Sequence, residues 1–390
     1  MASSHNVRWG IMATGWIAEE FTKDLLIDSK LRNAGDVSHT VAAVASSTSK
    51  DRAEKFIADF KVPSPCAAYG SYKELVQDKN VDIVYVATPH SHHFQNVMLA
   101  LENGKNVLCE KAFTVNAAQA KILVETAKQK NLFLMEAVWT RYFPISVEIR
   151  NRITSGDIGE VLRVVADTSF GGEEPEKKWG TKHRMVNKDL AGGALLDLGV
   201  YSLTWVFQTL YHTLPPASRK PPTVSTHMTA YPLTGADEAT TMLLTFPHST
   251  PSGAPNSKSH AVAMTHIRVA ANPSEERPSP AIRIQGTKGE IQLEGPAFCP
   301  THYRLIPAKL PGQEKAAPVE ERSFTFPGNG KGMYYEADEA ARCLRDGKLE
   351  SDGLTWEESV VIMEVMDEAR KQGGLTYPEK IESTVYPLEL

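Results

Sequence analysis

Two stretches of this sequence carry residues that could do acid–base chemistry. Glu110-Lys111 directly follows an apolar run, residues 106–109, that is typical of a buried strand. A lysine there is costly unless it has a partner or a function, although a solvated loop lysine also fits. Asp197 and Tyr201 lie four residues apart and would share one face of a helix that starts near Ala194. A carboxylate and a phenol together can bind and deprotonate a sugar-like hydroxyl, and a simply packed tyrosine is the alternative.

The start of the chain predicts a nucleotide-binding turn. Residues 7–12 indicate a strand, and Ala13-Thr14-Gly15-Trp16-Ile17 a tight turn into a helix. Aligned on the G-x-G-x-x-G fingerprint, the three glycine positions are Ala13, Gly15 and Ala18. Only the middle glycine, which lets backbone approach a pyrophosphate, is present. The pattern favours dinucleotide binding at residues 13–17, and an ordinary strand–helix turn stays open as the alternative.

The residues after the second predicted strand, 41–45, favour NADP over NAD. An NAD site places Asp or Glu there, to bind the 2′-hydroxyl of the ribose. This sequence instead has Ser46, Ser47 and Thr48, with Lys50 and Arg52 close behind. Hydroxyls and cations suit a 2′-phosphate, although Lys50 and Arg52 could simply be solvated at the start of a helix.

Three histidines follow the predicted strand at 81–87. Thr88-Pro89 leads into His90, His92 and His93, at the sheet edge where ligands of open α/β folds bind. Their spacing is poor for a metal, because no nearby cysteine or carboxylate completes a ligand set. We therefore expect no metal, and we expect these histidines to line a cofactor pocket or to cap the next helix.

Length and composition predict a two-domain cytoplasmic protein. The chain has 390 residues, and its net charge of −5 favours neither a nucleic-acid nor an anionic-membrane partner. Its four cysteines form no C-x-x-C pair, which indicates a reducing compartment. We see no secretory leader and no run of about twenty apolar residues, so we expect no membrane segment.

The order of elements predicts an α/β Rossmann domain followed by an α+β domain. Over residues 1–138, apolar strands alternate with helices, as in a doubly wound parallel sheet. Over 139–390, strands predicted between 161 and 294 favour a large open, mostly antiparallel sheet, with helices at 194–210, 333–345 and 356–371. Residues 215–222 and 248–260 are expected to be loops. An open sheet needs cover for its outer face, so we expect a homodimer.

Six motifs in order resemble the glucose–fructose oxidoreductase/inositol dehydrogenase (Gfo/Idh/MocA) family. Within it, the chain is most similar to the branch of NADP-dependent D-xylose 1-dehydrogenase and dimeric dihydrodiol dehydrogenase. The resemblance covers nearly the whole chain. The six motifs are residues 10–15, Ala87-Thr88-Pro89, Glu110-Lys111, residues 136–142, His183-Arg184-Met185 and residues 192–201.

The resemblance implies roles for single residues. Lys111 would lie by the nicotinamide and the substrate hydroxyl, Tyr201 would be the acid/base, and Asp197 would lie near the substrate. The family motif has proline where this chain has Ala112, so the preceding peptide bond could be cis or trans. Because a free phenol has a pKa near 10, Tyr201 would need a nearby cation such as Lys111 to act as a base.

The implied reaction is the NADP-dependent oxidation of an aldopyranose, best guess D-xylose, at C1. The product would be the aldono-1,5-lactone, with hydride passing to C4 of the nicotinamide. A trans-dihydrodiol or a dicarbonyl sugar is the alternative substrate on the same fold. A non-catalytic NADP-sensing regulator is the alternative of another class, and the presence of both Lys111 and Tyr201 weighs against it.

The residue patterns described above and the resemblance together give an expected residue set for each ligand, and Trp139, Arg141, Phe143 and Arg184 enter the substrate set by position alone. The expected cofactor residues are Ala13, Thr14, Gly15, Trp16, Ile17, Ser46, Ser47, Thr48, Lys50, Arg52, Tyr72, Thr88, Pro89, His90, His93, Glu110 and Lys111. The expected substrate residues are Trp139, Arg141, Phe143, Arg184, Asp197 and Tyr201. For each of the first four, a packing role fits the position as well.

Overall fold

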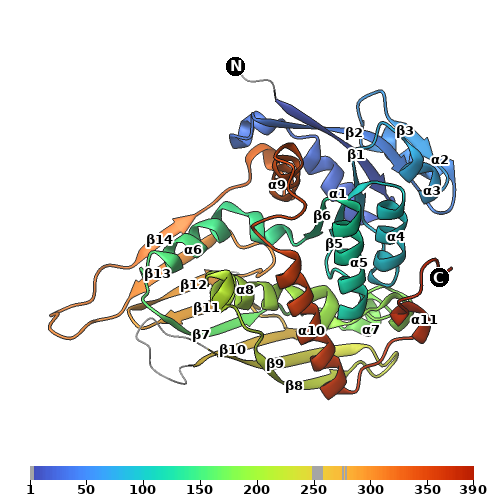
Figure 1. The fold of residues 1–390 in the computed structure, drawn as a ribbon. Helices are drawn as coiled ribbons and strands as arrows, with labels where there is room; N and C mark the ends of the chain where they lie inside the picture. Colours follow the sequence, from blue (N-terminus) through green and yellow to red (C-terminus); the bar gives the residue numbers. More distant parts are fainter. Residues whose placement is uncertain (1–3, 248–257, 275, 277–278) are drawn as a thin grey trace. The chain divides into compact units, whose positions relative to one another are not determined.

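The computed structural model describes residues 4–247, 258–274, 276 and 279–390 (Figure 1). The chain divides into two compact units. The first contains Met1–Tyr142, Phe326–Val360 and Glu379–Leu390, and the second contains Phe143–Thr325 and Val361–Pro378. That the first binds cofactor and the second binds substrate stays a prediction.

The first unit is built on a six-stranded parallel sheet. Its order is β3-β2-β1-β4-β5-β6, which reverses direction between β1 and β4, as in a doubly wound fold (Figure 1). The four residues of β4 are all buried, because helices cover both faces of such a sheet. The strands are β1 (His5–Met12), β2 (Val37–Ala45), β3 (Ala67–Tyr69), β4 (Ile83–Val86), β5 (Asn106–Glu110) and β6 (Leu134–Ala137). The predicted Rossmann sheet is confirmed.

Helices follow the strands, as the sequence predicts. They are α1 (Trp16–Leu25), α2 (Lys50–Asp59), α3 (Tyr72–Gln77), α4 (His90–Glu102) and α5 (Ala117–Lys130). Short 3-10 turns lie at Ser29–Arg32 and Trp139–Tyr142, and the C-terminal segments add α9 (Tyr334–Arg345) and α11 (Glu379–Glu382). Local chemistry sets several helix starts. The Ser71 side chain accepts from the Glu74 amide, which caps the start of α3, and it donates to the Glu74 carboxylate.

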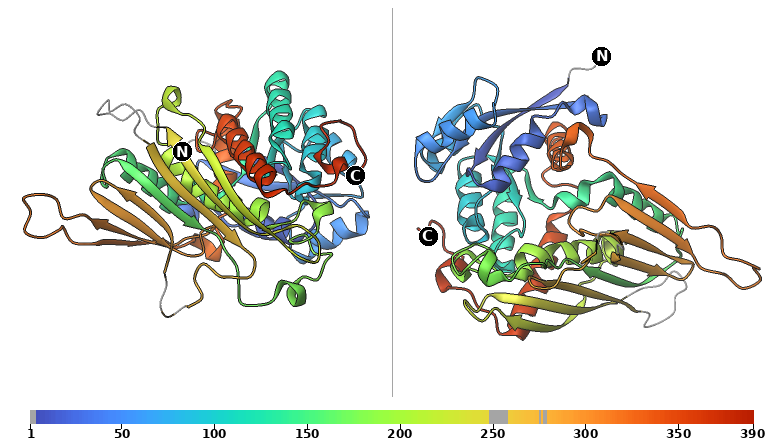
Figure 2. Two further views of the ribbon diagram at one scale, coloured as in Figure 1. Left: turned by 90° about the horizontal axis from the view of Figure 1, so that it is seen from below. Right: turned by 180° about the vertical axis from the view of Figure 1, so that it is seen from behind.

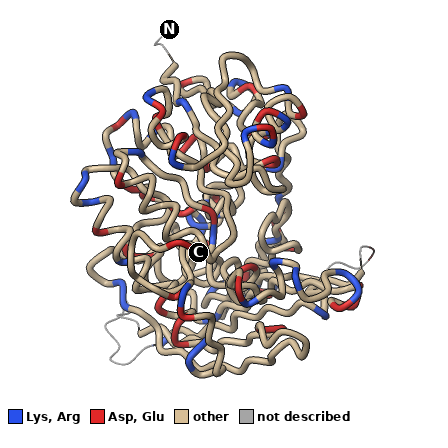
Figure 3. The backbone as a smooth tube through the Cα atoms, turned by 90° about the vertical axis from the view of Figure 1, so that its right-hand side faces the viewer, with Lys and Arg blue, Asp and Glu red and all other residues tan. Residues whose placement is uncertain are grey.

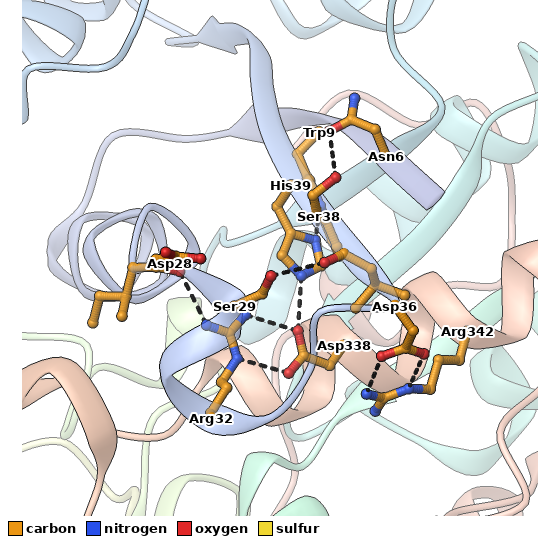
Figure 4. Close-up of polar contacts among 12 residues, drawn as sticks. Asn6, Trp9, Asp28, Ser29, Arg32, Asp36, Ser38, His39, Asp338 and Arg342 are labelled. Carbon is orange, nitrogen blue, oxygen red and sulfur yellow. Dashed lines mark hydrogen bonds and ion pairs between the residues drawn. The ribbon is translucent and has the colours of Figure 1, made fainter. Parts of the chain in front are cut away.

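A buried polar network ties α9 to the start of the sheet (Figure 4). Asp338 of α9 accepts from Nε and Nη2 of Arg32 at 2.7 and 2.8 Å, and it lies 2.9 Å from Nε2 of His39. Trp9 donates its indole N–H to Nδ1 of His39 at 3.1 Å, so the imidazole proton sits on Nε2 and faces Asp338. This network anchors a helix far along the chain to β1 and β2.

The second unit is built on an eight-stranded sheet. Its order is β14-β13-β12-β11-β7-β10-β9-β8 (Figure 2). Among the strand pairs of the described residues, β7 with β10 is parallel and the other pairs of this sheet are antiparallel, so the mostly antiparallel prediction is confirmed. The strands are β7 (Val161–Asp167), β8 (Thr223–Ala230), β9 (Asp237–Pro247), β10 (Lys258–His266), β11 (Pro280–Gly286), β12 (Gly289–Glu294), β13 (His302–Pro307) and β14 (Glu320–Ser323).

One long buried helix packs on this sheet. A π-helical turn, Leu195–Gly199, runs into α8 (Val200–Leu210), which contacts β7 and β10. The segment Lys188–Leu210 is long and apolar enough to cross a membrane, but 94% of its apolar window is buried inside the protein, as in a core helix. The other helices are α6 (Pro144–Thr154), α7 (Pro175–Lys178) and α10 (Trp356–Gly373), whose first residues belong to the first unit.

Several local predictions differ from the structure. Residues 258–260, expected in a loop, begin β10, and 248–257 lie outside the described residues. The loop predicted at 215–222 holds only the 3-10 turn Pro216–Ser218. Strands β3, β13 and β14 were not predicted, because β3 has only three residues and the short strands β13 and β14 contain no continuous apolar run.

Candidate active site

The turn between β1 and α1 leaves room for a phosphate. Ala13 has φ 102°, a backbone region that favours glycine, and its amide donates to the Ala45 carbonyl at 3.1 Å. Gly15 stands at the N-cap of α1, and a Cβ added there would meet nothing within 4 Å. Residues 13–17 are half-buried or exposed, so a ligand can reach them. Open space before the first turn of a ten-residue helix fits a pyrophosphate.

A second group of predicted cofactor residues gathers after β2. The Ser46 and Thr48 hydroxyls lie 3.0 Å apart, and Arg52 donates from Nη1 to Thr48 Oγ1 at 3.4 Å. Burial raises the pKa of Tyr72, while its hydrogen bond with Ser47 and the nearby Arg52 act in the opposite direction, which places these three side chains together. Hydroxyls, a phenol and a guanidinium therefore converge at one point, where they could bind a phosphate.

The Lys50 ammonium pairs with a residue outside this group. Its ammonium lies 3.4 Å from Glu54 Oε1, and both side chains are more than half exposed, at 62% and 56%. The arrangement is an ordinary i,i+4 surface pair on α2. Of the two predicted cations, Arg52 is the better placed toward the hydroxyl cluster.

The predicted residues after β4 and β5 lie together. His90 Nε2 is 3.1 Å from the Lys111 carbonyl, and His93 lies 2.9 Å from the Ala112 carbonyl and 2.8 Å from the Thr88 carbonyl. Asn96 donates to the Thr88 hydroxyl at 3.1 Å. Pro89 is the N-cap of α4. Thr88, His90, His93 and Lys111 thus form one cluster at the carboxyl edge of the parallel sheet.

Glu110 and Lys111 end β5 as predicted. The Tyr85 hydroxyl makes a short hydrogen bond to Glu110, and the Lys111 amide donates to Glu110 Oε2 at 3.2 Å. The peptide bond between Lys111 and Ala112 is cis, which answers the question that the sequence left open. Glu110 is buried and Lys111 is half-buried, so the lysine stands at the boundary between the sheet edge and solvent.

In the second unit, Asp197 and Arg184 form an ion pair. Arg184 Nη1 donates to Asp197 Oδ1 at 2.8 Å, joining two residues that the sequence placed in separate motifs. Asp197 lies in the π-helical turn and Tyr201 in the first turn of α8. Both side chains are largely buried, with Tyr201 only 7% exposed. The π turn changes the local hydrogen bonding of this helix, a feature that is frequent at functional sites.

Tyr201 adjoins a pocket that the sequence did not predict. Its ring lies 5.8 Å from that of Phe298, which packs edge-on against Phe170 at 5.6 Å. Phe170 and Phe298 line a pocket of about 450 Å³, together with Asp167, Ser169, Lys178 and Asn272 among others. Aromatic faces beside a carboxylate, an amide and an ammonium are the kinds of group that bind sugars.

Three predicted substrate residues, Trp139, Arg141 and Phe143, are not among the residues that line this pocket. Arg141 is fully buried, and its guanidinium donates to Glu358 at 2.8 Å and twice to the Gly353 carbonyl. This favours the packing alternative for Arg141. Phe143 is fully buried at the N-cap of α6, and half-buried Trp139 begins a 3-10 turn.

Glu136, the first residue of the 136–142 motif, is a buried titratable residue in β6. Its two oxygens accept from the Phe113 amide at 3.0 Å and the Ser359 hydroxyl at 2.7 Å. Burial raises the pKa of Glu136 to about 7, against the lowering effect of these two hydrogen bonds. Within the described part of the chain, no three His, Cys, Asp or Glu side chains group as metal ligands do.

Comparison with known proteins covers almost the whole chain. Residues 7–138 match the oxidoreductase family with an NAD-binding Rossmann fold, GFO_IDH_MocA, and residues 146–292 match the GFO/IDH/MocA C-terminal domain. A D-xylose 1-dehydrogenase (NADP(+)) from Hypocrea jecorina is 55% identical over 98% of this chain and 96% of that protein. A trans-1,2-dihydrobenzene-1,2-diol dehydrogenase from Sus scrofa is 35% identical over 96% of this chain and 98% of that protein.

A solved structure shares the fold. The chain resembles a 3-ketoreductase from Actinomadura kijaniata with a TM-score of 0.71 and 21% identity, over 94% of this chain and 98% of that one. The family resemblance inferred from six motifs is therefore confirmed. The chain belongs to the GFO/IDH/MocA oxidoreductase family.

Proposed function

We propose that this protein is an NADP-dependent dehydrogenase that oxidises an aldopyranose, with D-xylose as the first candidate, at C1 to the aldono-1,5-lactone. The observation that carries this proposal is the 55% identity over 385 residues with a D-xylose 1-dehydrogenase (NADP(+)). The dihydrodiol dehydrogenases, at 35% identity or less, support the alternative substrate more weakly.

The residues around the first turn and after β2 fit NADP. Open space beside Gly15 suits the pyrophosphate, and Ser47, Arg52 and Tyr72 suit the 2′-phosphate. A bound NADP would supply the acceptor for the hydride released from C1 of the sugar. Arg52 and the hydroxyls would select the phosphorylated form, because the end of β2 carries no acidic side chain to bind a free ribose hydroxyl.

Tyr201 and Lys111 would have separate roles in the removal of the C1 hydroxyl proton. Tyr201 accepts the proton of the C1 hydroxyl as the C1–H bond breaks, which leaves the carbonyl of the lactone. Lys111 stabilises the negative charge that develops on the C1 oxygen. Asp197 accepts a hydrogen bond from a sugar hydroxyl, and its ion pair with Arg184 orients its carboxylate.

The pocket beside Tyr201 is the proposed sugar pocket. Phe170 and Phe298 offer aromatic faces to the C–H edges of a pyranose ring. Asp167, Lys178 and Asn272 offer hydrogen-bond partners for its hydroxyls. Because all of these residues lie in the second unit with Tyr201, the proposal assigns sugar binding to that unit.

A homodimer is proposed on the sheet face opposite α8. A row of paired residues crosses this face: Ser225, Leu243, Val262, Val165, Arg283 and Gln292. Its centre is apolar, with Leu243 52% exposed, and its flank is polar. An apolar centre with a polar rim is typical of interfaces, and a second copy would cover it symmetrically. Sedimentation velocity tests the dimer.

A cytoplasmic location is proposed as well. All four cysteines are described by the structure as free thiols, in keeping with a reducing compartment. Basic and acidic residues are interspersed along the described backbone (Figure 3).

Absorbance of the reduced nicotinamide tests the function. NADP is offered with D-xylose, D-glucose or a trans-dihydrodiol, and we expect the fastest turnover with D-xylose. Tyr201→Phe should lower kcat by about 10²-fold or more without changing the Kd for NADP. Tyr211→Phe, at the other end of α8, is the matched control and should keep kcat. Faster turnover of the diol would overturn the substrate, and near-normal kcat in Tyr201→Phe would remove that tyrosine from the mechanism.

A further inference from the structure

The π-helical turn that carries Asp197 begins on a buried carboxylate from another part of the chain. The Leu195 amide donates to Asp237 Oδ2 at 2.6 Å, and the Thr240 hydroxyl donates to the same oxygen at 3.0 Å. Asp237 is the first residue of β9 and is 1% exposed. The first amides of a helix have no partner within it, so this carboxylate satisfies a donor and faces the positive end of the helix dipole. Asp237 thus provides the cap that Ala194, at the N-cap position, has no polar side chain to give.

Two glycines bring the start of this turn close to its neighbours. Gly193 has φ 138°, a backbone region that favours glycine, and a Cβ added there would lie 1.9 Å from Asp237 Oδ1. A Cβ added to Gly192 would lie 2.3 Å from the Arg184 carbonyl oxygen. Arg184 is the residue whose guanidinium pairs with Asp197. The start of the turn therefore packs against both Asp237 and the segment that supplies the partner of Asp197.

Stability alone does not explain an acidic residue at position 237. Oδ1 of Asp237 accepts no hydrogen bond within the described part of the chain, although the side chain is buried. Burial raises the pKa of Asp237 to about 6, against the lowering effect of its hydrogen bonds with Leu195 and Thr240. Burying a carboxylate with one unpartnered oxygen costs free energy of folding. Because such costs are found chiefly where function requires them, we expect Asp237 to serve the adjoining site.

The turn that Asp237 caps sets how two site residues lie relative to each other. Residues four apart share one face of a regular α-helix. A π-helical turn over Leu195–Gly199 changes this relation between Asp197, which lies inside it, and Tyr201, which follows it. Relaxation of this rare conformation to an ordinary α turn would shift one side chain relative to the other. Their arrangement therefore depends on the contacts that hold the start of the turn.

We propose that Asp237 is a positioning residue that fixes the start of the π-helical turn and so sets the relative positions of Asp197 and Tyr201. The proposal rests on the roles given to these two residues in the proposed function. Asp237 itself is assigned no contact with sugar or cofactor, so the expected effect of its loss is misplacement of the two side chains. A misplacement of about 1 Å can lower a rate about 10²-fold.

Two substitutions at Asp237 test this role. Asp237→Ala removes the acceptor and should lower kcat with D-xylose by about 10- to 100-fold. Asp237→Asn keeps a side-chain oxygen that can accept from the Leu195 amide, so its kcat should stay within about 3-fold of the wild type. Each kcat is measured well below the thermal midpoint of the variant, so that unfolded protein does not lower the rate. The Kd for NADP should change by less than about 2-fold in both, because the residues proposed to bind NADP lie in the first unit.

A third variant covers the case in which Asp237→Ala does not fold. Thr240→Val removes one hydrogen bond to Asp237 Oδ2 and should lower kcat by about 3- to 10-fold. Thr226→Val is the matched control, because it makes the same change in the neighbouring strand β8. The buried Thr226 hydroxyl has no hydrogen-bond partner among the described residues, so kcat should be kept. Adding Thr240→Val to Asp237→Ala should cause no further loss, since this hydroxyl acts through the carboxylate.

Several outcomes would overturn the positioning role. They are an unchanged kcat in Asp237→Ala, equal losses of kcat in Asp237→Ala and Asp237→Asn, and a loss in Thr226→Val as large as that in Thr240→Val. A loss of NADP affinity as large as the loss of kcat would also overturn it. If the wild type oxidises no aldose, the proposed function fails and this proposal fails with it. If the wild type is active and the variants match it, only the positioning role fails.

Discussion

Arg52→Ala should weaken the binding of NADP far more than that of NAD. Arg52 stands 3.4 Å from the Thr48 hydroxyl, beside Ser47 and Tyr72. A hydrogen bond to a charged group contributes about 1.5–3 kcal/mol. Arg52 is exposed, so solvent screening reduces this to about 1–2 kcal/mol. With a factor of ten for every 1.4 kcal/mol, the Kd for NADP should rise about 5- to 30-fold.

The Kd for NAD is the internal reference for this prediction. NAD lacks the 2′-phosphate, so its Kd should change by less than about 2-fold in Arg52→Ala. Lys50→Ala is the matched control, because its ammonium already faces Glu54 at 3.4 Å. It should raise the Kd for NADP by less than about 3-fold. Calorimetric titration with each nucleotide at low and high salt measures these values, and the effect of Arg52 should shrink as salt rises.

Three results would refute this reasoning. Equal losses for NAD and NADP would mean that Arg52 supports the fold of the turn rather than a phosphate. A larger loss for Lys50→Ala than for Arg52→Ala would reverse the order that their surroundings predict. A wild type that prefers NAD would remove the phosphate from this cluster altogether.

Two further predictions concern stability. Asp338→Asn leaves the fully buried Arg32 guanidinium short of a counter-charge and should lower the urea unfolding free energy by about 3–5 kcal/mol. Asp59→Asn, in an exposed i,i+4 pair with Lys55, should cost less than about 1 kcal/mol, and equal losses would contradict the argument. Burial raises the pKa of Glu136 from 4.5 to about 7, so its contribution to stability is full below pH 4.5 and is lost as pH rises through 7. Glu136→Gln should flatten that decline in urea titrations from pH 5 to 8, and an unchanged slope would contradict it.

The sequence predicted those parts of the fold that depend on local patterns. Strands such as β4 are continuous apolar runs, because both sheet faces are covered. The returning helix α9 was predicted as a helix, but its attachment was not. That attachment depends on Arg32 and Asp338, which lie 306 residues apart in the chain. No periodicity in either segment indicates such a pair.

The candidate site also contains residues that local motifs predict and residues that depend on long-range contacts. Lys111 and Tyr201 were predicted because each stands in a short motif that resembles the family, whereas spacing alone left a solvated lysine and a packed tyrosine as alternatives. Phe298 and Asn272 were missed, because they come from loops without a motif. They meet at the pocket only because the strands before those loops end at one edge of the second sheet. The topology of the sheet decides which loop residues line such a pocket, and a single sequence does not show that topology.

The histidines after β4 show how contacts decide between readings that a sequence leaves open. Three imidazoles in four residues suggest a metal by type and disfavour it by spacing. Both ring nitrogens of His93 lie within 2.9 Å of a carbonyl oxygen, at 2.9 Å from Ala112 and 2.8 Å from Thr88, which leaves no room for a metal ion at either nitrogen. Those carbonyls belong to Thr88 and Ala112, in the loops after β4 and β5, which also hold the expected cofactor residues Thr88 and Lys111. The ring that looked like a ligand is therefore better explained as a link between those loops, and Lys111 is attached to one of them.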